Sequence, residues 1–390
     1  MKLIPYGRQY VDKNDVGFVS RALKENLITT GNYVKKFERE ISNFLKVKFV
    51  LSCSSGTSAL HLSLLAINLK KNDIVIMPSV NFIAAYSMAK LLQARIFLAD
   101  VDDRTGQMTP KTLLDCIKKN KIKNVKAIIT MYLGGYAENV YEFYKIKKKF
   151  NCYLIEDACH ALGSAYKYKN NVYKIGSCIH SDLSTFSLHP VKTITSGEGG
   201  FVTTNNINFY NKIFLFRSHG IIKKNHWNYD IKQSGFNYRL SDINCALAFS
   251  QVKKINKFIK FRKKVFNFYK KKLSYHKLIS FPDYKNFNLS SYHLFIIKIN
   301  FKKLSVSKDY FINKMLKNKI FLQFHYKPIF FFKKLLQHKY HKKDFFGSMK
   351  YYKSFVSLPI YYGLSNDKLL YIINKIKLFI KLHESKFLKK

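Results

Sequence analysis

The sequence predicts an α/β protein with a mostly parallel central sheet flanked by helices and a smaller α/β C-terminal domain. Between about residues 48 and 205, short apolar β-rich runs alternate in strict order with helical patterns. This alternation is typical of a parallel sheet that helices cover on both faces. The chain of 390 residues is also too long for one small core, so we expect a second domain after the alternating region.

The elements follow one another along the chain. The first 45 residues are expected to form an N-terminal arm with one helix, at 13–24. Strands rich in apolar residues are expected at 49–52, 73–77, 96–101, 125–131, 152–156, 183–187 and 200–204. Helices are expected between them at 59–68, 82–92, 112–119 and 140–150, and a further helix is expected to end near residue 216.

The rest of the chain is expected to continue with a loop at 220–238, a long helix at 241–272 and strands at 293–299 and 320–325. The predicted organisation is an arm at 1–45, a large domain at 46–250 and a small domain at 251–390. In sheets of this kind, ligands bind beyond the carboxyl ends of the strands. The loops after the strands are therefore where we expect a site.

The charge of the chain suggests nucleic-acid binding, but its composition argues against specific binding. The 69 Lys and Arg residues outnumber the 23 Asp and Glu residues, for a net charge of +46. Only eight of the basic residues are Arg, and the Lys residues are scattered along the whole chain, whereas proteins that read bases and phosphates use Arg forks. A basic nucleic-acid-binding protein is the non-enzyme alternative. We expect instead that most lysines are solvated and that no specific nucleic acid is bound.

Other sequence features exclude several classes of protein. No apolar run approaches the roughly 20 residues of a membrane span, and no signal-peptide pattern stands at the N-terminus. We therefore expect a cytoplasmic protein that does not bind a membrane. The six Cys residues form no CxxC pair and no cluster with His, so neither a disulfide framework nor a metal site is expected.

Three local motifs point to chemistry, and the first is a run of hydroxyl residues around one glycine. Ser54-Ser55-Gly56-Thr57-Ser58 lies between the strand at 49–52 and the helix at 59–68. Exposed N–H groups and hydroxyls at a helix N-terminus bind phosphate. Taken alone, the run is also consistent with a simple capped turn.

The second motif is the strand end Ile155-Glu156-Asp157-Ala158-Cys159-His160. A carboxylate at the carboxyl end of a buried strand needs a cationic partner, because an unpaired buried charge is costly. A protonated pyridine nitrogen is one such partner. The alternative is that Asp157 only caps the next turn.

The third motif contains a single lysine in an apolar, hydroxyl-rich stretch. Phe186-Ser187-Leu188-His189-Pro190-Val191-Lys192 precedes a Gly-Glu-Gly-Gly turn at 197–200. A nucleophilic lysine needs a desolvated site, because the ordinary amine is almost fully protonated near pH 7. The alternative is that Lys192 is an ordinary surface residue.

Together with three shorter motifs, these elements resemble the DegT/DnrJ/EryC1/StrS sugar aminotransferases, which use pyridoxal 5′-phosphate (PLP) and have aminotransferase fold type I. The shorter motifs are Asp100-Val101-Asp102, Phe216-Arg217-Ser218-His219-Gly220 and Gly235-Phe236-Asn237-Tyr238-Arg239-Leu240. The motifs stand in the family's order and cover essentially the whole chain. The resemblance therefore implies transamination with PLP as the cofactor.

The resemblance also implies roles for individual residues. Lys192 would bind the cofactor covalently and move a proton to or from the substrate, Asp157 would pair with the pyridinium nitrogen, and His160 would contact the ring or its 3′ oxygen. Further cofactor contacts are implied for Ser55, Gly56, Thr57 and Ser187 at the phosphate, for Phe82 against the ring, and for Asn237 from the second subunit of a homodimer with shared active sites. The alternative for Phe82 is a core position.

Within the family, the stretches 160–164, 217–221 and 323–329 are most similar to aminotransferases of pseudaminic acid biosynthesis. This similarity implies a UDP-linked 4-keto-6-deoxy-N-acetylhexosamine as substrate and L-glutamate as amino donor. Sugar-nucleotide contacts are implied for Tyr6, Asn26, Leu27, Ile28, Thr29, His325, Tyr326 and Lys327. The alternatives are a 4-aminotransferase for a ketosugar of the legionaminic, bacillosamine or perosamine type, and a 3-aminotransferase.

Overall fold

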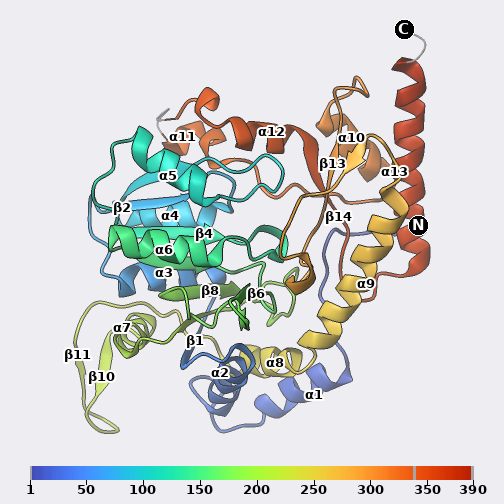
Figure 1. The fold of residues 1–390 in the computed structure, drawn as a ribbon. Coiled ribbons are helices and arrows are strands. Elements are labelled where there is room, and N and C mark those ends of the chain that lie inside the picture. Colours follow the sequence, from blue (N-terminus) through green and yellow to red (C-terminus); the bar gives the residue numbers. More distant parts are fainter. Residues whose placement is uncertain (1, 337–339, 388–390) are drawn as a thin grey trace.

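A seven-stranded sheet forms the centre of the computed structural model, which describes residues 2–336 and 340–387 (Figure 1). The strands are β1 (Phe49–Cys53), β2 (Ile74–Pro78), β3 (Arg95–Ala99), β4 (Ala127–Met131), β5 (Tyr153–Asp157), β8 (Leu183–Ser187) and β9 (Gly200–Thr204). Their order in the sheet is β1-β9-β8-β5-β4-β2-β3. Only β9 runs in the direction opposite to the other six strands. The predicted mostly parallel sheet is therefore confirmed.

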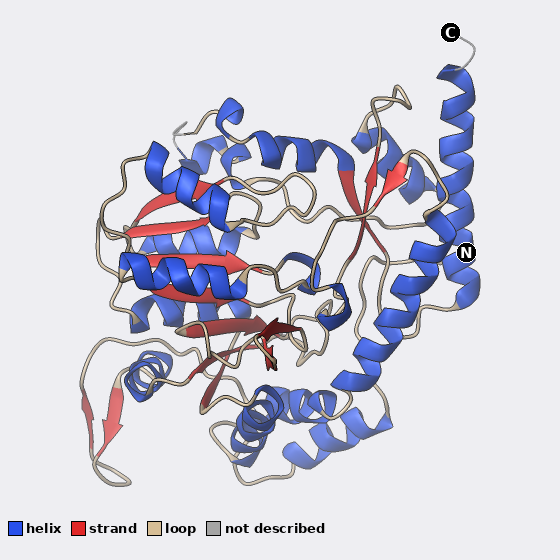
Figure 2. Cartoon of the chain, in the orientation of Figure 1, coloured by secondary structure: helices blue, strands red, loops and turns tan. Residues whose placement is uncertain are grey.

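Helices cover both faces of this sheet (Figure 2). Val75 and Met77 of β2 pack into the core that α3 (Gly56–Ala66), α4 (Ile83–Leu91) and α7 (Ile207–Arg217) form on one face. Ile76, between them, packs into the core of α5 (Pro110–Lys119) and α6 (Val140–Phe150) on the other face. Because successive side chains of a strand point to opposite faces, both neighbours must be apolar. This explains the continuous apolar runs in the sequence.

The N-terminal arm contains two helices. The predicted helix is α1 (Lys13–Ala22), and α2 (Asn32–Leu45) was not predicted, although apolar residues four apart mark its buried face. The first turn of α2 is capped from a distant part of the chain. The Asp242 carboxylate accepts the N–H groups of Gly31 and Tyr33, both at 2.7 Å.

Two expected elements differ from the structure, and one hairpin is additional. The predicted loop at 220–238 contains a hairpin of β10 (Ile221–Lys223) and β11 (Tyr229–Ile231), and Asn225 tightens its turn by accepting the N–H of Asn228 at 2.7 Å. The predicted long helix is two helices, α8 (Asp242–Val252) and α9 (Ile255–Leu273), whose apolar patterns are continuous across the break. A second hairpin, β6 (Ala165–Tyr168) and β7 (Asn171–Lys174), was not predicted.

The predicted strand at 320–325 is also wrong, because this segment changes its partner. The N–H of Phe321 donates to the carbonyl of Ile4 in the arm, at 2.9 Å. Gln323 instead pairs with Ser357 in β14 (Phe355–Leu358). Only isolated bridges result.

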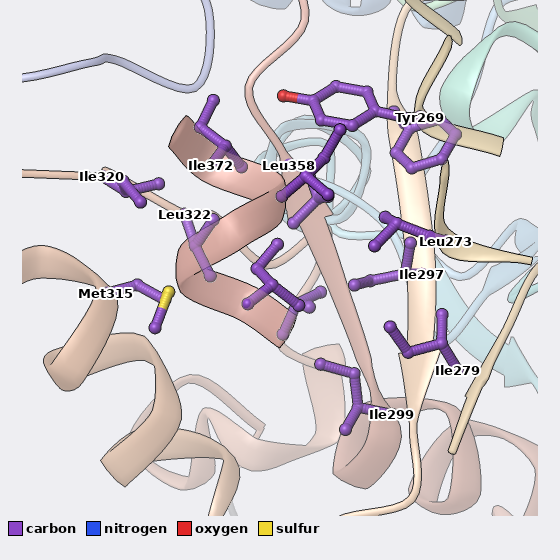
Figure 3. Packing of buried hydrophobic residues seen from close by; sticks show 14 of the residues in the cluster. Tyr269, Leu273, Ile279, Ile297, Ile299, Met315, Ile320, Leu322, Leu358 and Ile372 are labelled. Carbon is purple, nitrogen blue, oxygen red and sulfur yellow. The ribbon is translucent and has the colours of Figure 1, made fainter. Parts of the chain in front are cut away.

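A smaller sheet lies in the C-terminal part, in the order β12 (Ile279–Ser280), β13 (Phe295–Ile299) and β14. It packs with α9, α10 (Lys308–Lys317) and α13 (Asn366–Phe387), and Figure 3 shows Ile297, Leu358 and Ile372 meeting in this core. The segment with α11 (Lys333–Leu336) and α12 (Phe346–Ser354) lies between β13 and α13 in the chain. Its residues Ile329 and Phe345 belong to the core of α3 and α4, so the C-terminal part also covers the large sheet.

The helices and the cysteines bear on the expectations about membrane spans and disulfides. Within residues 2–336 and 340–387, every helix is too short or too polar to span a lipid bilayer. All six cysteines are free thiols, and only Cys159 is not fully buried.

Candidate active site

A cavity of about 410 Å³ is lined by Tyr6 near the N-terminus, by loops at the carboxyl ends of the large sheet and by residues of the C-terminal part. The predicted site residues that line it are Tyr6, Ser55, Gly56, Thr57, Phe82, Asp157, His160, Ser187, Lys192, His325 and Tyr326. They come from parts of the chain more than 300 residues apart. The fold therefore brings together all three motifs that the sequence analysis selected.

The first turn of α3 forms a cradle at one end of the cavity. In the sheet, Gly200 is paired with both Cys53, at the end of β1, and Ser187, at the end of β8. This pairing holds Ser187 against the helix, so that a Cβ at Gly56 would lie only 2.8 Å from the Ser187 Cβ. The first N–H groups of a helix have no partner within the helix, and with the helix dipole they favour an anion. The cradle therefore fits a phosphate.

Strand alternation separates the two carboxylates at the end of β5. Glu156 accepts the hydroxyls of Tyr132 and Ser184 on one face of the sheet. Asp157 points to the other face, lines the cavity and accepts the N–H of Cys159 at 3.3 Å. Burial raises the pKa of Asp157, and the charge of Lys192 acts against that rise. Such a carboxylate fits a cationic ligand group.

Lys192 ends a tight turn after β8, in which its N–H donates to the His189 carbonyl at 2.9 Å. Burial lowers the pKa of Lys192, and the neighbouring Cys159 and Asp157 partly offset this effect. A lower pKa increases the fraction of neutral amine, which is the form that attacks a carbonyl. Lys192 is half-buried at the cavity wall, and the lower pKa gives it more neutral amine than an ordinary lysine has.

His160 is held as a neutral ring. The N–H of Gly134 donates to its Nδ1 at 3.3 Å, so the ring proton lies on Nε2, which is 2.8 Å from the Tyr326 hydroxyl. Burial and the charge of Lys192 lower the pKa of His160 well below the ordinary value. His160 can therefore donate a hydrogen bond but does not act as a cation.

Phe82 and Tyr6 also line the cavity, and each lies beside another ring. Phe82 lies 5.7 Å from the Tyr326 ring, between centroids, and is 53% exposed, which excludes the core position. The ring of Tyr6 lies 5.5 Å from that of His325. The His325 Nδ1 is 2.9 Å from the Ser357 hydroxyl, and burial lowers the pKa of His325 to about 3.

The other predicted site residues lie outside the cavity. Asn26, Leu27, Ile28 and Thr29 are exposed, and the Ile28 carbonyl accepts the N–H of Asp242 at the start of α8. Asn237 is also exposed and forms a bridge with Ser218. Lys327 is exposed beside the ring of Phe332. One copy of the chain does not bring these residues to the cavity.

Several residues that line the cavity have no role predicted from the sequence: Met131, Cys159, His189, Val191, Glu198, His293, Gln323 and Phe324. Cys159, His189 and Glu198 lie within or beside the sequence motifs described above, so their position in the chain could have predicted that they line the cavity. His293 lies just before β13 in the C-terminal part of the chain. No local pattern connects it with the large sheet.

These residues fit PLP. The cradle offers donors for a phosphate, Asp157 offers a buried carboxylate for a ring cation, and Lys192 offers the amine, all around one cavity. Among the residues that the structure describes, no group of three or more His, Cys, Asp or Glu side chains is placed to hold a metal ion.

When bound, PLP supplies an electron sink that allows an amino group to be exchanged for a carbonyl oxygen. The protein supplies the remaining functions. Asp157 would keep the ring nitrogen protonated, and the Lys192 amine would bind the cofactor and carry a proton to or from the substrate carbon. The cradle at Gly56 would fix the phosphate, and Phe82 would limit the position of the ring.

Comparisons with known proteins agree with this arrangement. Residues 9–377 match the model of the DegT/DnrJ/EryC1/StrS aminotransferase family. The chain is 36% identical, over 386 residues, to a UDP-4-amino-4,6-dideoxy-N-acetyl-beta-L-altrosamine transaminase of Campylobacter jejuni, covering 96% of this chain and 99% of the relative.

Solved structures are similar over the same length. Helicobacter pylori PseC, an aminotransferase involved in the biosynthesis of pseudoaminic acid, has a TM-score of 0.87 and 28% identity, over 98% of this chain and 100% of the other. The PLP form of the sugar aminotransferase Spr1654 from Streptococcus pneumoniae has a TM-score of 0.88 at 23% identity, over 98% and 99%, and so shares the fold. The chain belongs to the DegT/DnrJ/EryC1/StrS aminotransferase family.

Proposed function

We propose that this protein transfers an amino group from L-glutamate to C4 of a UDP-linked 4-keto-6-deoxy-N-acetylhexosamine. The product would be UDP-4-amino-4,6-dideoxy-N-acetyl-β-L-altrosamine, an intermediate of pseudaminic acid and surface polysaccharide biosynthesis. The reaction would use PLP and proceed in two half-reactions, with glutamate first and the ketosugar second. We expect it to take place in the cytoplasm.

One observation carries the proposed chemistry: Lys192, Asp157 and the cradle at Gly56 line the same cavity. The choice of substrate is supported by the Campylobacter jejuni relative, whose name states this product and whose length the chain covers almost completely. We propose that Tyr6, His325 and Tyr326, which line the cavity, contact the sugar nucleotide.

We further propose that the active enzyme is a homodimer with shared sites. Asn237, Lys327 and the arm residues Asn26 to Thr29 are exposed in one copy. The β10–β11 hairpin projects from the large domain (Figure 1) and exposes apolar residues such as Trp227 (69%) and Ile231 (61%). Exposed apolar surface of this kind is typical of an interface. In the dimer, Asn237 of one subunit would reach the cofactor phosphate of the other.

The test is a substrate panel. Purified protein loaded with PLP is incubated with L-glutamate and ketosugars carried by UDP, GDP or dTDP, and the products are identified by mass spectrometry and NMR. We expect the UDP-linked 4-keto-6-deoxy-N-acetylhexosamine to give the 4-amino sugar most rapidly. Conversion of only GDP- or dTDP-linked sugars would contradict the proposed substrate, and conversion at C3 would contradict the proposed position.

A further inference from the structure

Three histidines from both domains meet in the cavity, and one of them has no assigned role. The ring of His293 lies 4.3 Å from that of His160, between centroids, and lines the cavity. His160 is held by Gly134 and Tyr326, and His325 is held by Ser357. His293 has no comparable side-chain partner among the described residues.

The two ring nitrogens of His293 differ in their surroundings. Nδ1 is fully buried and has no hydrogen-bond partner. Nε2 is not one of the buried unpaired nitrogens, and no described residue forms a hydrogen bond with it. Because the residue as a whole is only 3% exposed and lines the cavity, Nε2 is the nitrogen that borders the cavity.

Packing does not explain why a histidine stands at this position. A buried polar atom without a partner destabilises a protein, and an apolar ring of similar size would avoid this cost. The backbone hydrogen bonds of His293, to the Gly134 carbonyl at 3.0 Å and from Arg262 at 3.1 Å, do not require an imidazole. The structural reason for an imidazole at this position is therefore a hydrogen bond that Nε2 forms with a bound molecule.

The proton of the ring lies on Nε2. Burial, together with the charges of Lys192, Arg262 and His325, lowers the pKa of His293 well below the ordinary value, so the ring is neutral. A neutral ring carries one N–H, and a buried N–H without a partner is rarer in proteins than an unpaired acceptor. Nδ1 is therefore the unpaired acceptor, and Nε2 is a donor directed at the cavity.

We propose that His293 is a substrate-binding residue that donates a hydrogen bond from Nε2 to an oxygen of the bound substrate. This inference rests on the proposed aminotransferase function. The expected oxygen belongs to a carboxylate of the amino donor, because no arginine lines the cavity in the described part of the chain. Lys192 is the lining cation, and its amine is reserved for the cofactor. The same donor could serve a carbonyl or hydroxyl oxygen of the sugar.

The test compares two substitutions of His293 with a control in the PLP-loaded enzyme. His293→Phe keeps an aromatic ring but removes the donor, whereas His293→Gln keeps an N–H donor near the position of Nε2. The control is His276→Phe, because His276 also has a buried, unpaired Nδ1 but does not line the cavity. Glutamate binding is measured by calorimetry, the KM of each substrate by steady-state kinetics, and stability by thermal unfolding.

We expect His293→Phe to unfold at the same or a higher temperature and to bind glutamate about 10-fold more weakly, the effect of one lost hydrogen bond to a charged group. His293→Gln should recover most of the loss, and His276→Phe should bind like the unchanged protein. A rise confined to the KM of the ketosugar would also support the donor role and would assign the oxygen to the sugar. Unchanged affinity for both substrates in a folded, PLP-loaded His293→Phe protein would overturn the inference.

The result expected if the proposed function is wrong differs from the result expected if the role of His293 is wrong. In that case the unchanged protein would not aminate the UDP-ketosugar, while its calorimetric affinity for glutamate would still reveal any effect of His293→Phe. If His293→Phe lost PLP or failed to fold, His293→Gln would decide. A folded Gln variant with glutamate affinity within about twofold of the unchanged protein supports the donor role, and one with no measurable affinity contradicts it.

Discussion

At the residue scale, the cavity depends on differences between side chains of the same type. Glu156 and Asp157 are adjacent and both buried, but Glu156 is satisfied by hydroxyl donors, whereas Asp157 accepts one backbone N–H and faces the cavity. Lys192 likewise differs from the many solvated lysines of this chain, because burial lowers its pKa. Environment, and not residue type, assigns these roles.

Replacing Lys192 tests the covalent role of its amine. Lys192→Ala should abolish attachment of PLP, as seen by mass spectrometry of the protein after borohydride reduction, and should lower the transamination rate by several orders of magnitude. Lys174→Ala is the matched control. Burial also lowers the pKa of Lys174, but its amine donates a hydrogen bond to the Phe44 carbonyl and does not line the cavity. An adduct of undiminished yield in Lys192→Ala would refute the assignment.

The lowered pKa of Lys192 predicts how attachment depends on pH. The neutral amine is the reactive form, so the rate of PLP attachment to the apoprotein should rise with pH and reach half of its maximum below about 10.4, the ordinary lysine value. Stopped-flow absorbance over a range of pH measures this rate. A midpoint at or above that of a free lysine amine would contradict a desolvated amine.

Replacing Asp157 tests the predicted pairing with the ring cation. Asp157→Asn keeps the size of the side chain but removes its charge, and kcat should fall about 100-fold, as when one preorganised electrostatic contact is lost. PLP should remain attached at Lys192. In Glu156→Gln, the same change on the opposite face should lower the melting temperature, because the amide keeps only one acceptor oxygen and its NH2 group cannot accept the hydrogen bond of the second hydroxyl, from Tyr132 or Ser184, while kcat stays within a few fold. Equal loss of kcat in both variants would contradict the distinction.

At the element scale, the sheet positions the site because neighbouring strands end at the same edge. Cys53, Gly200 and Ser187 are joined across β1, β9 and β8, and Asp157 ends β5 beside β8. Only two residues separate the end of β1 from the start of helix α3, so its N-terminus lies at the same edge. One sheet edge therefore holds both the phosphate cradle and the carboxylate.

A substitution in the cradle tests this geometry. Gly56→Ala would place a Cβ 2.8 Å from the Ser187 Cβ and 3.3 Å from the Cys159 Sγ. Overpacking of this kind costs roughly 1–3 kcal/mol. If that cost falls on the bound state, the Kd for PLP should rise about 5- to 150-fold. The control is Gly17→Ala inside α1, where the nearest atom would be 3.6 Å away and stability should increase by about 0.5–1 kcal/mol. Unchanged PLP affinity in Gly56→Ala would mean that the cradle does not hold the phosphate.

The elements that the sequence predicted well are those whose signal is local. The strands of the large sheet are apolar on both faces and were located to within about two residues. The wrong expectation at 320–325 concerns partners distant in the chain, because this segment forms hydrogen bonds first with Ile4 and then with Ser357. The two missed hairpins are local, but their strands are only three or four residues long. The cavity shows the same division. Lys192 and Asp157 lie in local sequence motifs and could be predicted. His293 lies in no such motif and reaches the cavity only through the fold of the C-terminal part.

At the scale of the whole molecule, a single chain does not contain the complete predicted site. Asn26 to Thr29, Asn237 and Lys327 are exposed and do not line the cavity that they are expected to serve. The resemblance implies a second subunit, and the exposed hairpin supplies apolar surface for one. A closed twofold dimer with reciprocal contacts would complete both sites at once.

This arrangement makes a prediction that does not depend on the structure of the dimer. Lys192→Ala should be inactive through its own cavity, and Asn237→Ala should be impaired through the cavity of its partner. In a mixed dimer of the two variants, one site carries both substitutions and the other carries neither. Unfolding and refolding an equimolar mixture should therefore restore about one quarter of the unchanged activity, because half of the dimers are mixed and each has one intact site. If Asn237 served the cavity of its own chain, each site of a mixed dimer would contain one substitution, and mixing would restore nothing beyond the average of the two variants.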